Sequence, residues 1–163
     1  GDSRGYFMES YKKELFEKYI GAVDFIQDNE SRSSYGVVRG LHFQKGEYSQ
    51  AKLVRVTQGR VYDVIVDLRR SSPTFGQYIG VELSDDNKRQ LFVPRGFAHG
   101  FTVLSETAQF CYKVDNVYAP EHEATLLYND PHVGVVWPVK PEDMLLSPKD
   151  MKGLGFDEIE TFE

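Results

Sequence analysis

Hydrophobic positions along the chain follow two different periods. Between Tyr11 and Ile20, apolar side chains recur three or four residues apart, with charged residues between them. This spacing predicts a short amphipathic helix that ends at Gly21. Beyond it the pattern changes to short β-branched and aromatic runs, which are typical of strands. We expect strands at Val23–Gln27, Gly36–Gln44, Ala51–Gln58, Val61–Leu68, Gln77–Leu83, Gln90–Pro94, Phe97–Leu104 and Ala108–Val114.

Turn signals separate these runs and indicate the fold class. About eight short strands at regular spacing, with no helices between them, are typical of an antiparallel sandwich or barrel. A jelly roll fits best, because its two facing sheets leave a central cavity for a small ligand. The Cys…Trp…Cys spacing of an immunoglobulin sandwich is absent. The prediction is an all-β, antiparallel jelly roll (a cupin-like double-stranded barrel) with a short N-terminal helix and short helical turns near Ser147–Lys152.

The domain organisation predicted for this chain is simple. Its 163 residues suit a single domain over residues 1–163, and no internal repeat, linker or low-complexity segment interrupts them. Hydrophobic residues make up 40% and charged residues 27%, which are ordinary values for a globular protein. The chain starts at Gly1 in the middle of a turn-like Gly-Asp-Ser-Arg-Gly. We interpret this start as a missing N-terminal strand.

Charge and cysteine content narrow the partners. The net charge of −6 argues against general nucleic-acid binding, which needs a basic surface. No apolar run approaches the roughly 20 residues that span a bilayer, and no signal-peptide pattern opens the chain, so we expect no membrane association. The single cysteine, Cys111, cannot form an internal disulfide, which favours a cytoplasmic location.

The four histidines raise the question of a metal centre. Metal-binding barrels usually place two histidines two residues apart on one strand, with a carboxylate soon after. His42 is followed by Gln44 at that spacing, and His99 by Phe101. We therefore expect no metal site, although three strand positions from different strands remain able to converge in space.

The run from Val38 to Gln44 contains the strongest candidate for chemistry. Arg39, His42 and Gln44 place a cation, a titratable group and an amide in an otherwise apolar strand, which is costly unless they line a polar cavity. The alternative is a core histidine bonded to the backbone. Arg39 and His42 have opposite parity in a regular strand. Gly40 must therefore introduce an irregularity, such as a bulge, if both are to serve one pocket.

Two further side chains suit proton transfer with His42. Tyr112 should point inward from its strand by parity, and Lys52 opens the strand that follows the histidine. A histidine can take a proton, a tyrosine can return one, and a lysine can stabilise an oxyanion. A serine hydrolase is less convincing, because no Gly-x-Ser-x-Gly elbow occurs. No glycine-rich phosphate loop occurs either, so a diphosphate would be held by side chains such as Arg4, Arg39 and Gln27.

Ordered motifs run through nearly the whole chain. They include Asp2–Glu9 (DSRGYFME), Phe25–Asn29 (FIQDN), Val38–Gln44 (VRGLHFQ), Pro94–Phe101 (PRGFAHGF) and Ser147–Asp150 (SPKD). This ordered set resembles the dTDP-4-dehydrorhamnose 3,5-epimerase family, a group of cupin-type jelly rolls. The resemblance implies an enzyme that inverts C3 and C5 of dTDP-4-dehydro-6-deoxy-D-glucose, giving dTDP-4-dehydro-L-rhamnose through an enolate and without a cofactor.

The resemblance also implies a role for each matching position. His42 matches the base, Asp150 the carboxylate that orients it, Tyr112 the acid on the opposite face of the sugar, and Lys52 the cation near the C4 oxygen. Tyr118 matches the ring that stacks on the thymine. The other substrate-binding matches are Arg4, Glu9, Gln27, Asp28, Asn29, Arg39, His99, Glu123 and Lys149.

Beyond the substrate, the resemblance implies a second subunit. Arg4 and Glu9 match positions that reach the partner's site, which predicts a homodimer with exchanged N-terminal strands. Other functions stay open at this point. A close variant inverts only C3 or acts on another nucleotide-linked 4-keto deoxy-sugar. A cupin that binds a sugar nucleotide without catalysis, and a metal cupin such as a dioxygenase or isomerase, are the alternatives of other classes.

Overall fold

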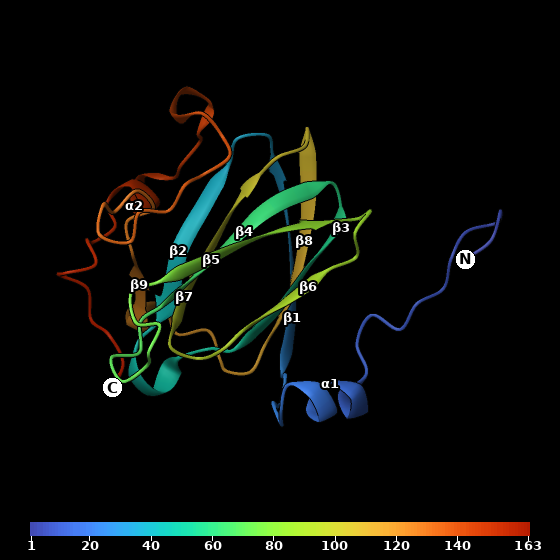
Figure 1. The fold of residues 1–163 in the computed structure, drawn as a ribbon, viewed down its shortest axis with the longest axis horizontal. Helices are drawn as coiled ribbons and strands as arrows, with labels where there is room; N and C mark the ends of the chain where they lie inside the picture. The colour runs from blue at the N-terminus through green and yellow to red at the C-terminus, as the bar shows by residue number, and fades with distance from the viewer.

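The computed structural model describes residues 1–163 and consists of two facing antiparallel sheets (Figure 1). The four-stranded sheet has the order β1-β8-β3-β6, with β1 at Gln27–Ser34, β8 at Thr107–Val114, β3 at Lys52–Gln58 and β6 at Gln90–Val93. The five-stranded sheet has the order β5-β4-β7-β2-β9, with β5 at Tyr78–Ser84, β4 at Arg60–Asp67, β7 at Phe97–Val103, β2 at Val38–Gln44 and β9 at Glu123–Thr125. The predicted jelly roll is confirmed.

Helical segments are few and short. They are α1 at Lys13–Tyr19, α2 at Pro148–Met151 and the 3₁₀ turns η1 at Gly46–Tyr48, η2 at Pro120–His122 and η3 at Pro141–Asp143. Both the N-terminal helix and the C-terminal helical turn lie where the sequence predicts them. Neither α-helix has the length and apolar content that crossing a bilayer requires.

The predicted strands from Gly36 to Val114 are confirmed, with ends that differ by one or two residues. The strand predicted at Val23–Gln27 is wrong, because β1 begins only at Gln27, where the predicted run ends. Strand β1 is an edge strand whose residues are mostly polar and exposed. Its place is set by pairing with β8, with Gln27 opposite Val114, rather than by an apolar pattern. The sequence pattern does not predict the three-residue strand β9.

Two hydrophobic clusters cover both faces of the five-stranded sheet. One includes Val61 and Ile65 of β4 and reaches Phe110 of the opposite sheet, so it fills space between the sheets. The other includes Val64 and Val66 of the same strand and packs against Phe156 from the C-terminal segment. Burial on both faces explains why β4 has apolar residues at consecutive positions, Val64, Ile65 and Val66, instead of alternating ones.

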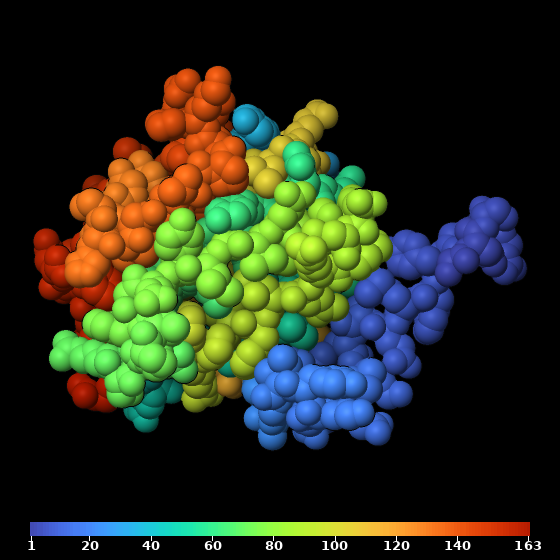
Figure 2. Space-filling view, in the orientation of Figure 1, coloured from blue at the N-terminus to red at the C-terminus, as the bar shows by residue number.

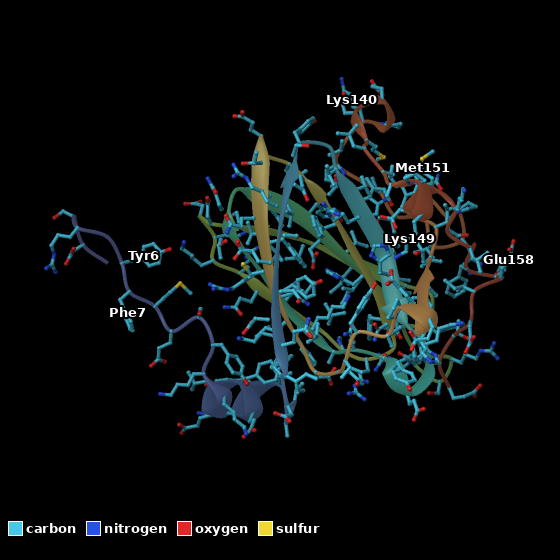
Figure 3. All side chains as sticks on the ribbon, turned by 180° about the vertical axis from the view of Figure 1, so that it is seen from behind. Tyr6, Phe7, Lys140, Lys149, Met151 and Glu158 are labelled. Atoms are coloured by element: carbon cyan, nitrogen blue, oxygen red, sulfur yellow. The ribbon has the colours of Figure 1, made fainter.

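The N-terminal segment leaves the body of the molecule as an arm (Figures 1 and 2). Tyr6 and Phe7 stand on this arm with 67% and 90% of their surface exposed (Figure 3). Helix α1 follows the arm and is anchored by Phe16, which is buried and packs its ring against Phe25 and Phe92 with centroid distances of 5.4 and 5.5 Å. The arm itself buries little apolar surface in one subunit.

Candidate active site

A cavity of about 400 Å³ lies between the two sheets. This volume is within the range of small-molecule sites, and a mostly polar lining suits a polar ligand. Side chains from both sheets and from the neighbouring loops line it: Gln27, Asn29, Glu30, His42, Phe43, Gln44, Gln50, Lys52, Tyr112, Tyr118 and Glu123.

His42 enters the cavity from β2 and is held from behind by Asp150. Its Nε2 lies 2.6 Å from Oδ1 of Asp150, a carboxylate at the start of α2 that is only 3% exposed. The second oxygen, Oδ2, accepts a hydrogen bond from the backbone N–H of Gly40 at 3.1 Å. Burial by itself raises the pKa of Asp150, but the hydrogen bonds from His42 and Gly40 outweigh it, and the net shift is downward. Asp150 is therefore ionised, so Nε2 of His42 carries the proton and Nδ1 is the basic nitrogen.

The backbone irregularity predicted at Gly40 is confirmed. The pairing of β2 with β7 shifts register between Arg39 and His42, and Gly40 has a φ of +115°. A Cβ atom at this glycine would lie 2.7 Å from the carbonyl oxygen of His99 and 2.8 Å from the Cα of Gly100, so a side chain cannot be accommodated. The irregularity does not bring Arg39 into the cavity lining. Its Nε donates instead to Oγ of Ser33 at 3.0 Å.

Lys52 and Tyr112 face His42 from the opposite sheet. The ammonium of Lys52 lies 5.8 Å from the centroid of the Tyr112 ring. Burial lowers the pKa of Lys52 to about 8, although the carboxylates of Asp63 and Glu123 act in the opposite direction. Burial raises the pKa of Tyr112, so the phenol keeps its proton at neutral pH. His42 and Tyr112 thus lie on opposing walls of one cavity, with the ammonium of Lys52 near the Tyr112 ring.

A second histidine–carboxylate pair lies behind the first. His99 of β7 is opposite His42 in the strand register but is only 6% exposed and does not line the cavity. Its Nε2 lies 2.7 Å from Oδ1 of Asp63, a fully buried residue of β4. Burial lowers the pKa of His99, which favours the neutral imidazole. Asp63 is missed by the sequence analysis, although a carboxylate inside the apolar run of β4 is a signal that it needs a partner.

Glu123 and Tyr118 line the cavity, and Lys149 is joined to it through Glu123. Glu123 of β9 lines it and forms an ion pair with Lys149, which precedes Asp150 in α2. Tyr118 lines the cavity with 64% of its surface exposed. Gln27 and Asn29 line it from β1, as the sequence predicts, whereas Glu30 and Gln50 line it without having been predicted.

Besides Arg39, His99 and Lys149, three more predicted binding residues lie outside the cavity lining. Asp28 pairs with Lys113 at 2.9 Å and is not part of the cavity lining. Arg4 and Glu9 lie on the N-terminal arm, where the exposed guanidinium of Arg4 pairs with Asp2 at 2.6 Å. No group of three or more histidine, cysteine, aspartate or glutamate side chains is placed to hold a metal ion.

Comparison with known proteins assigns the family. The family model described as dTDP-4-dehydrorhamnose 3,5-epimerase matches residues 1–158. The chain belongs to this family. It is 53% identical over 163 residues to the dTDP-4-dehydrorhamnose 3,5-epimerase of Pseudomonas aeruginosa, a match that covers 99% of this chain and 89% of the relative.

Solved structures of dTDP-4-dehydrorhamnose 3,5-epimerases share the whole fold. The enzyme from Elizabethkingia anophelis superposes with a TM-score of 0.93 at 53% identity, over 97% of this chain and 87% of that one. A dTDP-6-deoxy-D-glucose-3,5-epimerase from Legionella pneumophila, solved in complex with dTDP-4-keto-L-rhamnose, has a TM-score of 0.94 at 49% identity, over 98% and 85% of the two chains. The family resemblance inferred from the ordered motifs is therefore confirmed.

Proposed function

We propose that this chain inverts C3 and C5 of dTDP-4-dehydro-6-deoxy-D-glucose to give dTDP-4-dehydro-L-rhamnose. The family and the homologous structure with dTDP-4-keto-L-rhamnose support the substrate class. The observation that carries the chemistry is His42 on one sheet, paired with Asp150 of α2 and facing Tyr112 and Lys52 on the other sheet. A proton acceptor and a proton donor on opposite walls are what inversion of a carbon centre needs.

The reaction uses the acidity of the protons next to a ketone. In a 4-keto sugar, the hydrogens on C3 and C5 are both α to the C4 carbonyl, so removing either gives a delocalised enolate. Nδ1 of His42 accepts this proton, because Nε2 already donates to Asp150 at 2.6 Å. The imidazolium that forms is stabilised by the Asp150 carboxylate. Tyr112 then returns a proton from the other face, and the centre is inverted.

Lys52 stabilises the negative charge that develops on the C4 oxygen. Its side chain lines the cavity between the sheets, where a charge interaction is stronger than in bulk water. The interaction grows as the carbonyl becomes an enolate, so it favours the transition state over the bound ketone. After inversion at one centre, His42 releases its proton to solvent and Tyr112 takes one up, and the same four side chains then act on the second centre.

The nucleotide part of the substrate binds to residues other than the four that carry the proton transfer. Tyr118, exposed where the cavity opens, offers a flat face on which the thymine stacks. Gln27 and Asn29 of β1 and the Glu123–Lys149 pair supply polar contacts for the sugar and the diphosphate. Asp28, Arg39 and His99 do not line the cavity. For His99, we propose that it supports His42 from behind.

A homodimer with exchanged N-terminal arms explains the remaining predicted residues. Tyr6 and Phe7 are exposed on an arm that projects from the body, which is costly unless another surface covers them (Figure 3). We propose that a second subunit covers them and that Arg4 and Glu9 of this arm reach its cavity. Arg4 would there meet the diphosphate as a bidentate donor. A cytoplasmic location stays a prediction.

Solvent deuterium incorporation tests the activity and separates the alternatives. Incubation of the wild-type protein with dTDP-4-dehydro-6-deoxy-D-glucose in D₂O should label both C3 and C5, as read by NMR and mass spectrometry. Label at C3 alone would select the variant that inverts one centre. Binding of the substrate without any deuterium label would favour a non-catalytic cupin that binds a sugar nucleotide over an epimerase.

Variants of the two proton-transfer residues test the mechanism. His42→Ala should abolish the label, because it removes the side chain that accepts the proton from C3 and C5. Tyr112→Phe should retain some exchange, since a proton can leave without the acid on the opposite face, but should yield little inverted product. His132→Ala, on an exposed histidine that does not line the cavity, is the matched control and should behave as wild type. Exchange at the wild-type rate in His42→Ala would refute the assignment of the base.

A further inference from the structure

The side chain of Gln44 connects three backbone groups of two separate loops. It is 4% exposed and lies at the end of β2, two residues after His42. Its Nε2 donates to the carbonyl oxygens of Tyr48 at 2.8 Å and Val117 at 2.9 Å, and its Oε1 accepts from the N–H of Ala119 at 2.8 Å. Both hydrogens of the amide group are therefore used by the protein itself, so Gln44 has no donor left for a ligand.

These bonds hold the segment from Asp115 to Ala119, which we term the mouth loop. Tyr118 lies in this loop, between Val117 and Ala119, the two residues whose backbone is hydrogen-bonded to Gln44. A second pair of hydrogen bonds joins the same two segments. Nε2 of Gln50 donates to the carbonyl of Asn116 at 2.9 Å, and Nδ2 of Asn116 donates to the carbonyl of Glu47 at 3.0 Å. Asp115, at the start of the mouth loop, is bound to Ala51 through its backbone and its carboxylate, and from Asn116 onward the loop is fixed to the segment that follows β2 through side-chain amides.

Tyr118 itself is held only through its backbone. Its ring is 64% exposed, and no side-chain hydrogen bond fixes the phenol. The position and direction of its Cα–Cβ bond, from which the ring extends, therefore depend on the backbone of a residue whose two neighbours are both bound to Gln44. Ordering a free loop residue on binding costs about 1–2 kcal/mol of backbone entropy, which a loop fixed in advance does not lose.

We propose that Gln44 is a positioning residue that fixes the mouth loop before ligand arrives and so presents the Tyr118 ring to the nucleotide base. This inference rests on the proposed function, because it assumes that the nucleotide stacks on Tyr118. It assigns to Gln44 an effect on nucleotide binding that is transmitted through another residue. A purely structural role would change the stability of the protein but would not depend on the ring at position 118.

A double-mutant cycle on dTDP binding tests this dependence. Gln44→Met keeps the volume of the side chain but leaves the Ala119 N–H and two carbonyls without their partner. We expect the Kd for dTDP, measured by calorimetry, to rise about 10-fold in Gln44→Met. In a Tyr118→Ala background, the same change should raise it less than about twofold, because no ring remains to be positioned. An equal rise in both backgrounds would overturn the proposal.

Steady-state kinetics gives a second, independent result. Gln44→Met should raise KM in the deuterium-exchange assay while kcat changes by less than about threefold, since Gln44 contributes to binding before chemistry. A loss of kcat with unchanged KM would contradict the proposal. Gln58→Met is the matched control, because this exposed glutamine at the far end of β3 does not line the cavity. It should leave Kd, KM and kcat unchanged.

Two further measurements keep the test decisive. If Gln44→Met does not fold, Gln50→Ala removes a hydrogen bond of the second pair to the same loop and should raise the Kd for dTDP in the wild-type background only. Amide hydrogen exchange on the ligand-free protein should show faster exchange of the Ala119 N–H in Gln44→Met, and unchanged exchange would overturn the proposal. A wild-type protein that does not bind dTDP would instead refute the proposed function, so the two failures are distinguishable.

Discussion

Asp150→Asn changes the pair that sets the proton on His42, while keeping the shape of the side chain. The carboxylate uses both oxygens, one toward Nε2 of His42 at 2.6 Å and one toward the N–H of Gly40 at 3.1 Å. An amide has only one accepting oxygen. If that oxygen faces His42, the amide NH₂ meets the Gly40 N–H. If it faces Gly40, the NH₂ donates to Nε2, and the imidazole proton must move to Nδ1, the nitrogen that should accept from the sugar.

The magnitude follows from these two arrangements. The first leaves a buried N–H without an acceptor, which costs about 1–3 kcal/mol, and the second gives the wrong tautomer. In both, the imidazolium loses its anionic partner, a loss that lowers kcat about 10⁴-fold when the pair is fully buried. The His42 side chain is 31% exposed, so water screens part of the interaction. We therefore expect kcat to fall about 10²–10³-fold, equivalent to about 3–4 kcal/mol of transition-state stabilisation.

The assay is the rate of deuterium incorporation at C3 and C5 with saturating substrate. KM should change little, because Asp150 lies behind His42 and does not line the cavity. Asp157→Asn is the control, since this carboxylate near the same end of the chain is 79% exposed and should leave the rate unchanged. A folded Asp150→Asn protein that exchanges within about threefold of the wild-type rate would refute this account of how His42 is held in its basic form.

Two further outcomes follow from the site. Because burial lowers the pKa of Lys52 to about 8, its ammonium is lost as pH rises through that value, and kcat for exchange should decline above about pH 8. Lys52→Met should be slower and should lack this decline at alkaline pH. A decline that persists in Lys52→Met would show that another group causes it. Gly40→Ala should lower the free energy of unfolding by about 2–5 kcal/mol, measured by urea denaturation, because its Cβ meets backbone atoms at 2.7 and 2.8 Å. Gly46 has a φ of +58° and no atom within 4 Å of the position that a Cβ would take, so Gly46→Ala is the control for backbone strain alone and should lower the free energy of unfolding by about 1 kcal/mol. Equal losses of stability in the two variants would show that the protein relieves the clash at Gly40.

Much of the architecture could be predicted from local pattern. Strand β4 has consecutive apolar residues, Val64, Ile65 and Val66, which predict it, whereas the polar edge strand β1 carries no apolar alternation and is not predicted by the pattern. The difference is physical: β4 is buried on both faces, while β1 is held by its hydrogen-bond ladder with β8. A strand that depends on the ladder more than on burial leaves little trace in hydrophobicity.

The candidate site divides in the same way. Parity placed Tyr112 on the inner face, and the clash of parities at Arg39 and His42 predicted the irregularity at Gly40. Parity could not show that Arg39 would turn to Ser33 instead of the cavity. The ordered motifs, rather than any periodicity, connected Asp150 with His42.

The sequence by itself determined the strands between Val38 and Val114, the inward side of β8 at Tyr112 and the place where the backbone of β2 must be irregular. Those properties depend on neighbours a few residues away. Only the tertiary structure decided that Asp150 lies behind a histidine 108 positions earlier, that Asp63 holds His99 across two strands, and that Gln44 fixes the loop of Tyr118. An alternating pattern records that a face is covered but not which residue covers it, because partners distant in sequence are chosen by the pairing and packing of whole sheets.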